Sequence, residues 1–402
     1  MLFHVLRGLF PIVLWCLAPV VLLGVGACGS LQSAVAPGAA ITPPEDGAFS
    51  ESNDAGPSNN DALPSESDEE QEAGSTDAGQ NNADASNPDP SDDEPNPPTV
   101  YDPALDGDLV FSTSQIDASL PNGSDLPLTI YLPGSEGSHP VVVFTHGFQL
   151  SPSLYESYGE HLASWGYVVV MPQMPGGALG PIGAPNHASL KDTLKSVLSW
   201  VVSQAADAQG PLADKADANR IGLAGHSMGG KISLLTATED SRVVAVFGID
   251  PVDSAGGPGS SDGPDYPSVT PELMDEITVP LGILGETTNA TCEGLFCQAC
   301  APEENNFHQY YLHATSPALE IEVLGANHMS FLDDPNCGFT CSACPVGTDD
   351  PAVSRQLVRR YMNAFFQVFL FENDTYDVYL DGTASQTDVA AGLITVASKN
   401  GL

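Results

Sequence analysis

From about residue 101 onward, short apolar runs alternate with segments whose apolar residues recur every three or four positions. The short runs are bounded by Gly, Pro, Asn, Asp and Ser and have the length of buried strands. They cover residues 109–111, 126–132, 139–145, 167–171, 221–224, 242–249, 279–285 and 319–324. We expect the run at 319–324 to be the last strand of the core.

Helical periodicity fills several of the gaps between these runs, namely at residues 152–165, 188–206 and 353–369. Residues 375–402 match neither pattern. Strands that alternate with helices predict an α/β fold, with a mostly parallel central sheet covered by helices on both faces. In such sheets the active site lies at the carboxyl ends of the strands.

The first 27 residues predict an export signal. They carry one basic residue, Arg7, then an apolar run over residues 9–25 and small residues before Cys28. A cysteine at this point is typical of a bacterial lipoprotein, in which Cys28 would be lipidated and become the new N-terminus. An ordinary signal peptide cut nearby and an uncleaved membrane anchor are the alternatives.

Residues 28–100 are rich in Ser, Asp, Glu, Asn, Pro and Gly and nearly lack large apolar side chains. Such a segment cannot bury enough apolar surface to offset the entropy of ordering, so we expect a disordered acidic tether. Its acidic clusters could instead bind calcium or a partner. The sequence thus predicts three parts: a signal at 1–27, the tether at 28–100 and a catalytic domain at 101–402.

The chain has 52 acidic and 11 basic residues and a formal net charge of −41. After Arg7 the next basic side chain is Lys191. Nucleic acid and anionic lipid headgroups are therefore poor partners. We expect a monomer that touches a membrane only through its N-terminal lipid.

Residues 219–235 read as a strand, a sharp turn and a helix without a gap, with the sequence GHSMGGK at the turn. This context is typical of a nucleophile elbow, and it makes Ser227 the candidate nucleophile. Glycines two places on either side let neighbouring backbone pass close to the strained serine. A second G-x-S-x-G match, around Ser261, lies in a Gly/Pro/Ser/Asp stretch without a flanking strand or helix, and we interpret it as a loop.

The acid and the base of a Ser-Asp-His arrangement should follow the nucleophile in that order, each just past a strand. The run at 242–249 is followed by Asp250, and the run at 319–324 is followed by His328. We therefore predict that His328 is the general base and that Asp250 orients it. Asp253, in a stretch expected to be mobile, and Glu286, at the end of the next strand, are the alternative acids.

Acyl transfer also needs donors for the developing oxyanion. We assign them to the backbone N–H of Met228, directly after the nucleophile, and to that of Phe148, in the loop after residues 139–145. Phe148, Met174 and Phe331 are expected to line an apolar cleft.

Four segments together resemble the chlorophyllases, which are α/β-hydrolases that cleave the phytyl ester of chlorophyll. The segments are GHSMGGK, IDPVD, GETTNATCEGLFCQACAPEENNFHQYY and GANHMSFLDD. The resemblance implies an α/β-hydrolase fold and the triad Ser227, Asp250 and His328. The chain is also similar to platelet-activating-factor acetylhydrolases and, more loosely, to cutinase-like polyesterases. Met228 stands where plant chlorophyllases usually have Arg, so the resemblance implies the chemistry more than the substrate.

Six cysteines of the predicted domain form two trios. The first comprises Cys292, Cys297 and Cys300, and the second comprises Cys337, Cys341 and Cys344. An even number in an exported chain predicts disulfides, and we expect at least one bridge to join the trios and fix the loop that carries His328. The C-x-x-C spacing within each trio leaves a metal site as the alternative.

Together these patterns predict a serine carboxylester hydrolase that needs neither metal nor cofactor and acts on a small or polymeric apolar ester. We expect it to be exported and attached by lipid at the outer membrane, at the cell surface or in the periplasm. A polyesterase and a phospholipid acetylhydrolase are alternative enzymes. A surface binding protein without catalytic activity is the alternative from another class.

Overall fold

The computed structural model describes residues 100–176, 185–255, 262–292, 299–338 and 341–402. These residues build a nine-stranded sheet in the order β1-β2-β4-β3-β5-β6-β7-β8-β9. The five pairs from β4 to β8 are parallel, and β1, β2 and β9 join the sheet by antiparallel pairing. The predicted fold class, α/β with a mostly parallel sheet, is confirmed.

The strands are β1 (Phe111–Ser119), β2 (Asp125–Pro133), β3 (His139–Thr145), β4 (Val168–Pro172), β5 (Ala216–His226), β6 (Val243–Ile249), β7 (Leu281–Glu286), β8 (Ala318–Val323) and β9 (Ile394–Lys399). The α-helices are α1 (Glu156–Ser164), α2 (His187–Ala206), α3 (Met228–Ala237), α4 (Phe307–His313), α5 (Pro351–Phe371), α6 (Asp377–Leu380) and α7 (Thr383–Ala390). The described residues also form the single 3-10 turns η1 (Pro152–Leu154), η2 (Met274–Glu276), η3 (Cys341–Ala343) and η4 (Asp374–Tyr376).

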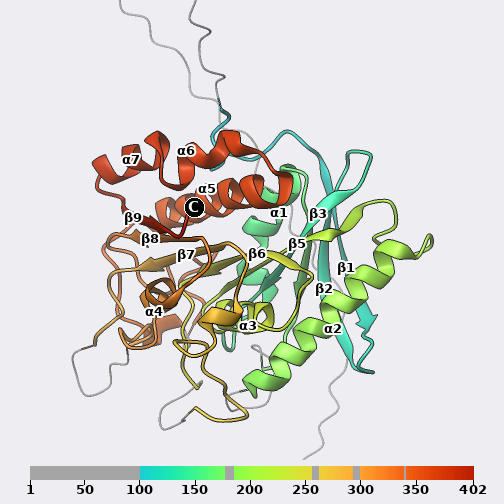
Figure 1. Cartoon of the computed structure of the whole chain (residues 1–402), viewed down its shortest axis with the longest axis horizontal. Coiled ribbons are helices and arrows are strands. Elements are labelled where there is room, and N and C mark those ends of the chain that lie inside the picture. Colours follow the sequence, from blue (N-terminus) through green and yellow to red (C-terminus); the bar gives the residue numbers. More distant parts are fainter. Residues whose placement is uncertain (1–99, 177–184, 256–261, 293–298, 339–340) are drawn as a thin grey trace, which may run out of the picture. The chain divides into compact units, whose positions relative to one another are not determined.

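Helices cover both faces of the sheet (Figure 1). Side chains of α1 and α5 pack on one face in a core that contains Phe144, Phe247 and Phe366. Side chains of α2, α3 and α4 pack on the other, in a core that contains Ile221 and Leu281. Every residue of β3 and of β4 is buried, because both faces of these central strands are covered.

The two edges of the sheet differ from the sequence prediction. Residues 109–111 were expected to form a strand, but β1 begins at Phe111 and continues through the polar residues to Ser119. At the other edge, β8 is not the last strand, because β9 pairs antiparallel with it from Val323↔Ile394 to Ala318↔Lys399. Residues 375–402, which matched no pattern, form η4, α6, α7 and β9.

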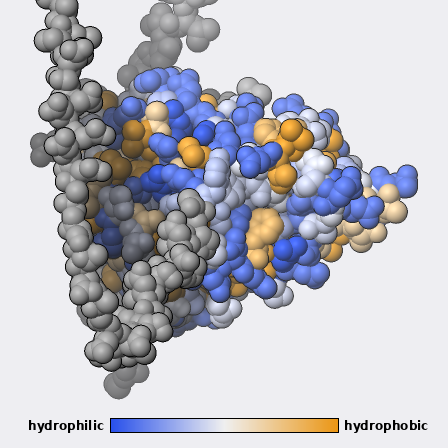
Figure 2. All heavy atoms as spheres, turned by 90° about the horizontal axis from the view of Figure 1, so that it is seen from above, coloured by the Kyte–Doolittle hydropathy of each residue, from blue (hydrophilic) through white to orange (hydrophobic). Residues whose placement is uncertain are grey.

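The face in Figure 2 is mainly polar where it is coloured, and hydrophobic residues are scattered over it. Within the described residues, no helix has both the length and the apolar composition to cross a membrane. The predicted signal at 1–27, Cys28 and the tether predicted at 28–100 lie outside the described residues, apart from Val100. Ser261 and Cys297 lie outside them as well.

Candidate active site

Ser227 occupies the sharp turn between β5 and α3 with φ 56° and ψ −122°, a backbone conformation that residues other than glycine rarely adopt. A Cβ on Gly225 would lie 2.5 Å from the carbonyl carbon of Gly229, and one on Gly229 would lie 2.2 Å from the oxygen of Thr145. Both glycines are therefore needed for the close approach of this turn to β3. The turn has the geometry expected of a nucleophile elbow.

The structure brings Ser227, His328 and Asp250 together, although they are far apart in the sequence. The Ser227 Oγ lies 2.8 Å from His328 Nε2, and His328 Nδ1 lies 2.5 Å from an Asp250 carboxylate oxygen. Asp250 is fully buried, His328 is nearly so, and Ser227 is partly accessible. In the consistent tautomer, Ser227 donates its hydroxyl proton to Nε2, and Nδ1–H donates to Asp250.

Burial shifts the pKa values of both partners toward their neutral forms. It lowers the pKa of His328 to about 4, because the imidazolium loses its hydration. It raises the pKa of Asp250 as well, but the hydrogen bond from His328 Nδ1–H stabilises the ionised carboxylate, which is the form that this contact favours. The imidazole of His328 is therefore neutral at pH 7, which leaves Nε2 free to accept a proton from the serine.

Asp250 is placed by a turn directly after β6, with φ 43°. Its N–H donates to the carbonyl of Leu284 in the neighbouring strand β7, at 2.5 Å. One carboxylate oxygen of Asp250 contacts His328, and the other is buried with no hydrogen-bond partner among the described residues. Backbone contacts with β7 thus fix the direction in which this carboxylate points.

Glu286, the alternative acid, does not contact His328. Its carboxyl group accepts the N–H groups of Thr288 and Asn289 at the end of β7. Burial, and then the nearby charge of Asp250, raise the pKa of Glu286 to about 8. Glu286 therefore shapes the turn that follows β7 and is mostly protonated at pH 7.

Asp253, the other alternative, is also remote from His328. It forms a buried ion pair with Lys231, at 3.0 Å, in which both side chains are at most 1% exposed. It also accepts hydrogen bonds from Ser268, Val269 and Thr270. The expectation that Asp253 lies in a mobile stretch is wrong at this residue, because the pairing with Lys231 of α3 fixes it.

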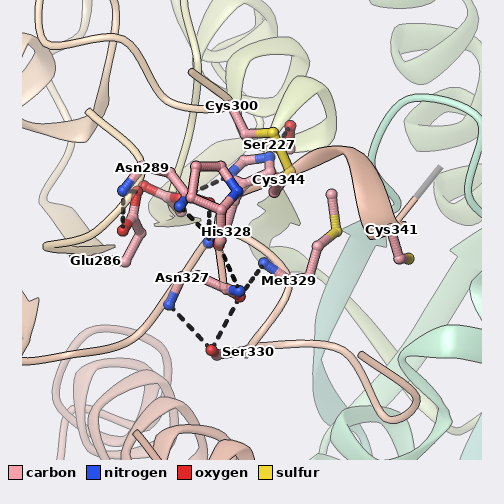
Figure 3. Close-up of a disulfide and its surroundings, with 12 residues drawn as sticks. Ser227, Glu286, Asn289, Cys300, Asn327, His328, Met329, Ser330, Cys341 and Cys344 are labelled. Carbon is pink, nitrogen blue, oxygen red and sulfur yellow. Dashed lines mark hydrogen bonds and ion pairs between the residues drawn. A yellow bond between two sulfur atoms is a disulfide. The ribbon is translucent and has the colours of Figure 1, made fainter. Parts of the chain in front are cut away.

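Asn289 holds the backbone of His328, and the sequence did not single it out. Its side-chain oxygen accepts the N–H of His328 at 3.0 Å, and its side-chain nitrogen donates to the carbonyl of Pro345. The amide of Asn327 donates to the same carbonyl at 2.9 Å. Figure 3 shows Asn289 between Glu286 and His328. An asparagine in a loop after β7 gave no signal of this role, because its partner lies 39 residues further along the chain.

The backbone N–H groups of Met228 and Phe148 have no hydrogen-bond acceptor among the described residues. Met228 begins α3, where N–H groups lack partners within the helix. The loop that carries Phe148 is supported by His146, which contacts the Gly147 carbonyl through Nδ1 and accepts the Met174 N–H through Nε2. Their assignment to the oxyanion remains a prediction.

A disulfide connects the loop that carries His328 to the loop after β7. Cys300 and Cys344 form a bridge between the two trios, and Cys337 and Cys341 form another within the second trio. Cys292 is disulfide-bonded too. The Cys300–Cys344 bridge lies beside Ser227 and His328 (Figure 3). The expected bridge between the trios is present, and cysteines in disulfides cannot act as thiolate ligands.

The predicted apolar cleft needs one correction. Phe331 is fully buried and its ring packs edge-on against His226, so it belongs to the core and does not line a cleft. Met174 is also nearly buried, while Phe148 is partly exposed. Within the described residues, no group of three or more His, Cys, Asp or Glu side chains is arranged to hold a metal ion.

Comparison with known proteins adds a family relationship to this geometry. The sequence model of the family described as "Chlorophyllase" matches residues 99–386. The chain is 25% identical to chlorophyllase-2 of Arabidopsis thaliana over 265 residues, which cover 63% of this chain and 78% of that protein. It is 30% identical to chlorophyllase-1 of the same plant over 220 residues, covering 53% and 65%. It is 26% identical to the chloroplastic chlorophyllase-1 of Citrus unshiu over 278 residues, covering 67% and 80%.

Proposed function

Because the chain belongs to the chlorophyllase family of α/β-hydrolases, and is therefore a carboxylic ester hydrolase, we propose that it acts through Ser227, His328 and Asp250. The observation that carries the proposal is the continuous contact from Ser227 Oγ through the imidazole of His328 to Asp250, at 2.8 and 2.5 Å. The three residues follow three different strands and meet at the carboxyl ends of these strands, where this architecture places its active sites.

In the proposed reaction, Ser227 Oγ attacks the ester carbonyl carbon while His328 Nε2 takes the hydroxyl proton. The imidazolium formed at that moment is buried, and the Asp250 carboxylate stabilises it through Nδ1–H. His328 then returns the proton to the leaving alcohol, and an acyl group remains on Ser227. Water activated by His328 releases the acid in the second half of the reaction.

The tetrahedral intermediate carries a negative oxygen that needs preorganised donors. The N–H groups of Met228 and Phe148 suit this role, since neither has a protein acceptor among the described residues. Loss of one such donor typically lowers kcat by about 100- to 1000-fold.

The substrate that we propose is an ester with an apolar alcohol or acyl part. Its support is the family relationship, whose curated members carry the name chlorophyllase. A panel of chlorophyll, p-nitrophenyl esters of rising chain length, a polyester film and an acetylated phospholipid tests this class. Hydrolysis of the film or of the phospholipid in preference to the other esters would instead assign a polyesterase or an acetylhydrolase.

We also propose export and attachment through a lipid on Cys28. The signal-like pattern of residues 1–27 supports this, as do the disulfides Cys300–Cys344 and Cys337–Cys341, which persist in oxidising compartments. Metabolic labelling with an alkyne fatty acid should mark the wild-type chain and leave Cys28→Ala unlabelled. Equal labelling of both chains would refute lipidation at this cysteine.

Replacement of Ser227 by alanine tests the enzyme mechanism. Ser227→Ala should abolish both hydrolysis of p-nitrophenyl butyrate and labelling by a fluorophosphonate, because both need the serine Oγ. Ser153→Ala is the matched control, since Ser153 is exposed in η1 and should keep both activities. Labelling of the Ser227→Ala chain at the wild-type rate would show that another residue is the nucleophile.

A further inference from the structure

We propose that His226 is a positioning residue, which holds the backbone of the general base and the oxyanion loop in register with the nucleophile. The inference rests on the function proposed above. His226 is the last residue of β5 and directly precedes Ser227 in the chain. Its side chain is fully buried.

The imidazole of His226 connects three parts of the site. Its Nε2 lies 2.9 Å from the carbonyl oxygen of His328. Its Nδ1 lies 2.8 Å from the hydroxyl of Tyr155, and that hydroxyl accepts the N–H of Gly147 at 3.2 Å. Gly147 is the residue before Phe148 in the predicted oxyanion loop.

The direction of each hydrogen bond follows from its partners. A carbonyl oxygen can only accept, so Nε2 of His226 must carry the proton that it donates to His328. Burial, and then the nearby His328, lower the pKa of His226 well below its usual range, so the ring stays neutral. Nδ1 then has a free lone pair and accepts the Tyr155 hydroxyl proton, whose pKa burial raises. In this tautomer each donor in the series of hydrogen bonds that runs from the Gly147 N–H through Tyr155 and His226 to the His328 carbonyl has an acceptor.

This arrangement fixes both backbone polar groups of the base with side chains from other strands. The N–H of His328 donates to Asn289, after β7, and its carbonyl accepts from His226, at the end of β5. His328 lies in a loop after β8, outside any helix or strand, so the regular hydrogen bonds of secondary structure do not hold it. The covalent neighbour of the nucleophile thereby sets the distance between Ser227 and the base.

The same ring packs directly on the oxyanion loop. A Cβ on Gly147 would lie 3.1 Å from His226 Nδ1 and 3.3 Å from the Tyr155 hydroxyl. The rings of His226 and His328 are 4.6 Å apart between centroids. A positive charge on His226 at this distance would oppose formation of the His328 imidazolium, so the neutral state of His226 is also the one that favours catalysis.

Two variants whose side chains at position 226 have similar length separate a positioning role of His226 from a role in packing alone. Glutamine at position 226 can place its amide N–H near the position of the imidazole Nε2, whereas methionine has a similar volume and no donor. We expect His226→Gln to keep kcat for p-nitrophenyl butyrate within about 5-fold of wild type. We expect His226→Met to lower kcat about 10- to 100-fold with KM nearly unchanged, because displacement of a catalytic group costs rate and not ground-state binding.

The acid limb of the pH profile of kcat/KM provides a second measurement. Its apparent pKa would not change if His226 had only a structural role. The groups that face His328 are Ser227 and His226 from the end of β5, Asp250 from β6 and Asn289 after β7. In His226→Met the less restrained base gains hydration, so the apparent pKa of this limb should rise toward the ordinary 6.5 of histidine, while His226→Gln keeps it low.

Equal kcat in the Gln and Met variants, or a loss that appears only in KM, would overturn the proposal. If His226→Met does not fold, Tyr155→Phe tests the same series of hydrogen bonds, since it removes the hydroxyl that joins His226 Nδ1 to the Gly147 N–H. We expect kcat of Tyr155→Phe to fall about 3- to 10-fold at constant KM, and an unchanged kcat would overturn the proposal. Ser227→Ala, measured in parallel, separates the two hypotheses: if it stays active, the proposed mechanism fails, whatever the position-226 variants do.

Discussion

The choice between Asp250 and Glu286 as the acid can be tested by two isosteric substitutions. Asp250→Asn keeps the shape of the side chain and removes the charge that faces His328 Nδ1 at 2.5 Å. The new amide can also donate to Nδ1, which would leave the proton of the imidazole on Nε2, where the base must accept one. Glu286→Gln makes the corresponding change in a carboxyl group whose hydrogen-bond partners among the described residues are the backbone N–H groups of its own turn.

The two substitutions should differ by orders of magnitude in rate. Loss of the triad carboxylate in a serine protease lowers kcat about 10⁴-fold, which corresponds to about 5 kcal/mol of transition-state stabilisation, and we expect a similar loss for Asp250→Asn. Glu286 is buried with its pKa raised to about 8, so it is already neutral at pH 7. A neutral glutamine should therefore change kcat at pH 7 by less than about 10-fold.

The pH dependence of the free energy of unfolding tests the protonation state of Glu286 in a second way. Its pKa rises from 4.5 in the unfolded chain to about 8 in the folded one, so the folded state binds more protons between these values. Wild-type stability should therefore fall as pH rises from 4.5 to 8, and Glu286→Gln should lack this loss. At about 1.4 kcal/mol per pKa unit, the difference between the variant and wild type at pH 8 has an upper limit of about 5 kcal/mol.

The assays are kcat and KM for p-nitrophenyl butyrate at pH 7, fluorophosphonate labelling rates, and urea unfolding at pH 5 and 8. A loss of 1000-fold or more in Glu286→Gln, with Asp250→Asn close to wild type, would refute the assignment of the acid. A stability difference between Glu286→Gln and wild type that does not change with pH would refute the proposed protonation state of Glu286.

Three further substitutions test the supports of the site. Gly229→Ala should lower kcat by more than about 100-fold or prevent folding, seen by circular dichroism, because its Cβ would lie 2.2 Å from Thr145 O, and wild-type activity would contradict this. Lys231→Met should cost about 3–5 kcal/mol in urea unfolding, because it leaves Asp253 buried without a cation, and Lys231→Met with Asp253→Asn should recover part of the loss. Removal of the bridge Cys300–Cys344 should lower kcat more than removal of Cys337–Cys341, because only the former joins the loop of the base to the loop after β7; equal effects would count against this role.

The positions of the three residues proposed as the triad could be predicted because each follows a run of buried apolar residues. β6 is strongly apolar, and β8 alternates buried apolar residues with glutamates, so Asp250 and His328, which follow these strands, could be assigned to their carboxyl ends. The turn at Ser227 carried its own signal in Gly225 and Gly229, whose absent side chains the structure requires. Local pattern and global arrangement agree at these points.

The edge strands could not be predicted from hydrophobic pattern alone. β1 exposes most of its residues and packs on one neighbour, so its sequence FSTSQIDAS lacks an apolar run. In β9, only Ile394 is fully buried. An edge strand is held by backbone pairing with its neighbour, and pairing leaves little trace in a single sequence.

The supporting residues of the site are invisible to sequence reasoning for a related reason. His226, Asn289 and Lys231 each bind a partner at a distant position in the chain, or in a loop without a pattern. From the sequence alone, His226 is indistinguishable from a histidine of the core. The residues around it do not show whether its ring only packs in the core or also donates to the carbonyl of His328. Only the three-dimensional contacts separate the two.

The distribution of these contacts explains why an α/β-hydrolase can carry its base on a loop. A helix or strand would fix His328 through its own repeating hydrogen bonds, but the segment after β8 has none at this residue. Its precision must come from side chains on rigid neighbours: His226 on β5 for the carbonyl, Asn289 after β7 for the N–H, and Cys300 through its bridge to Cys344. These supports lie at the end of β5 and in the loop after β7, so strain in one of them displaces His328 without opening the sheet. Substitutions at the residues that support His328 should therefore abolish catalysis and leave the core of the fold intact.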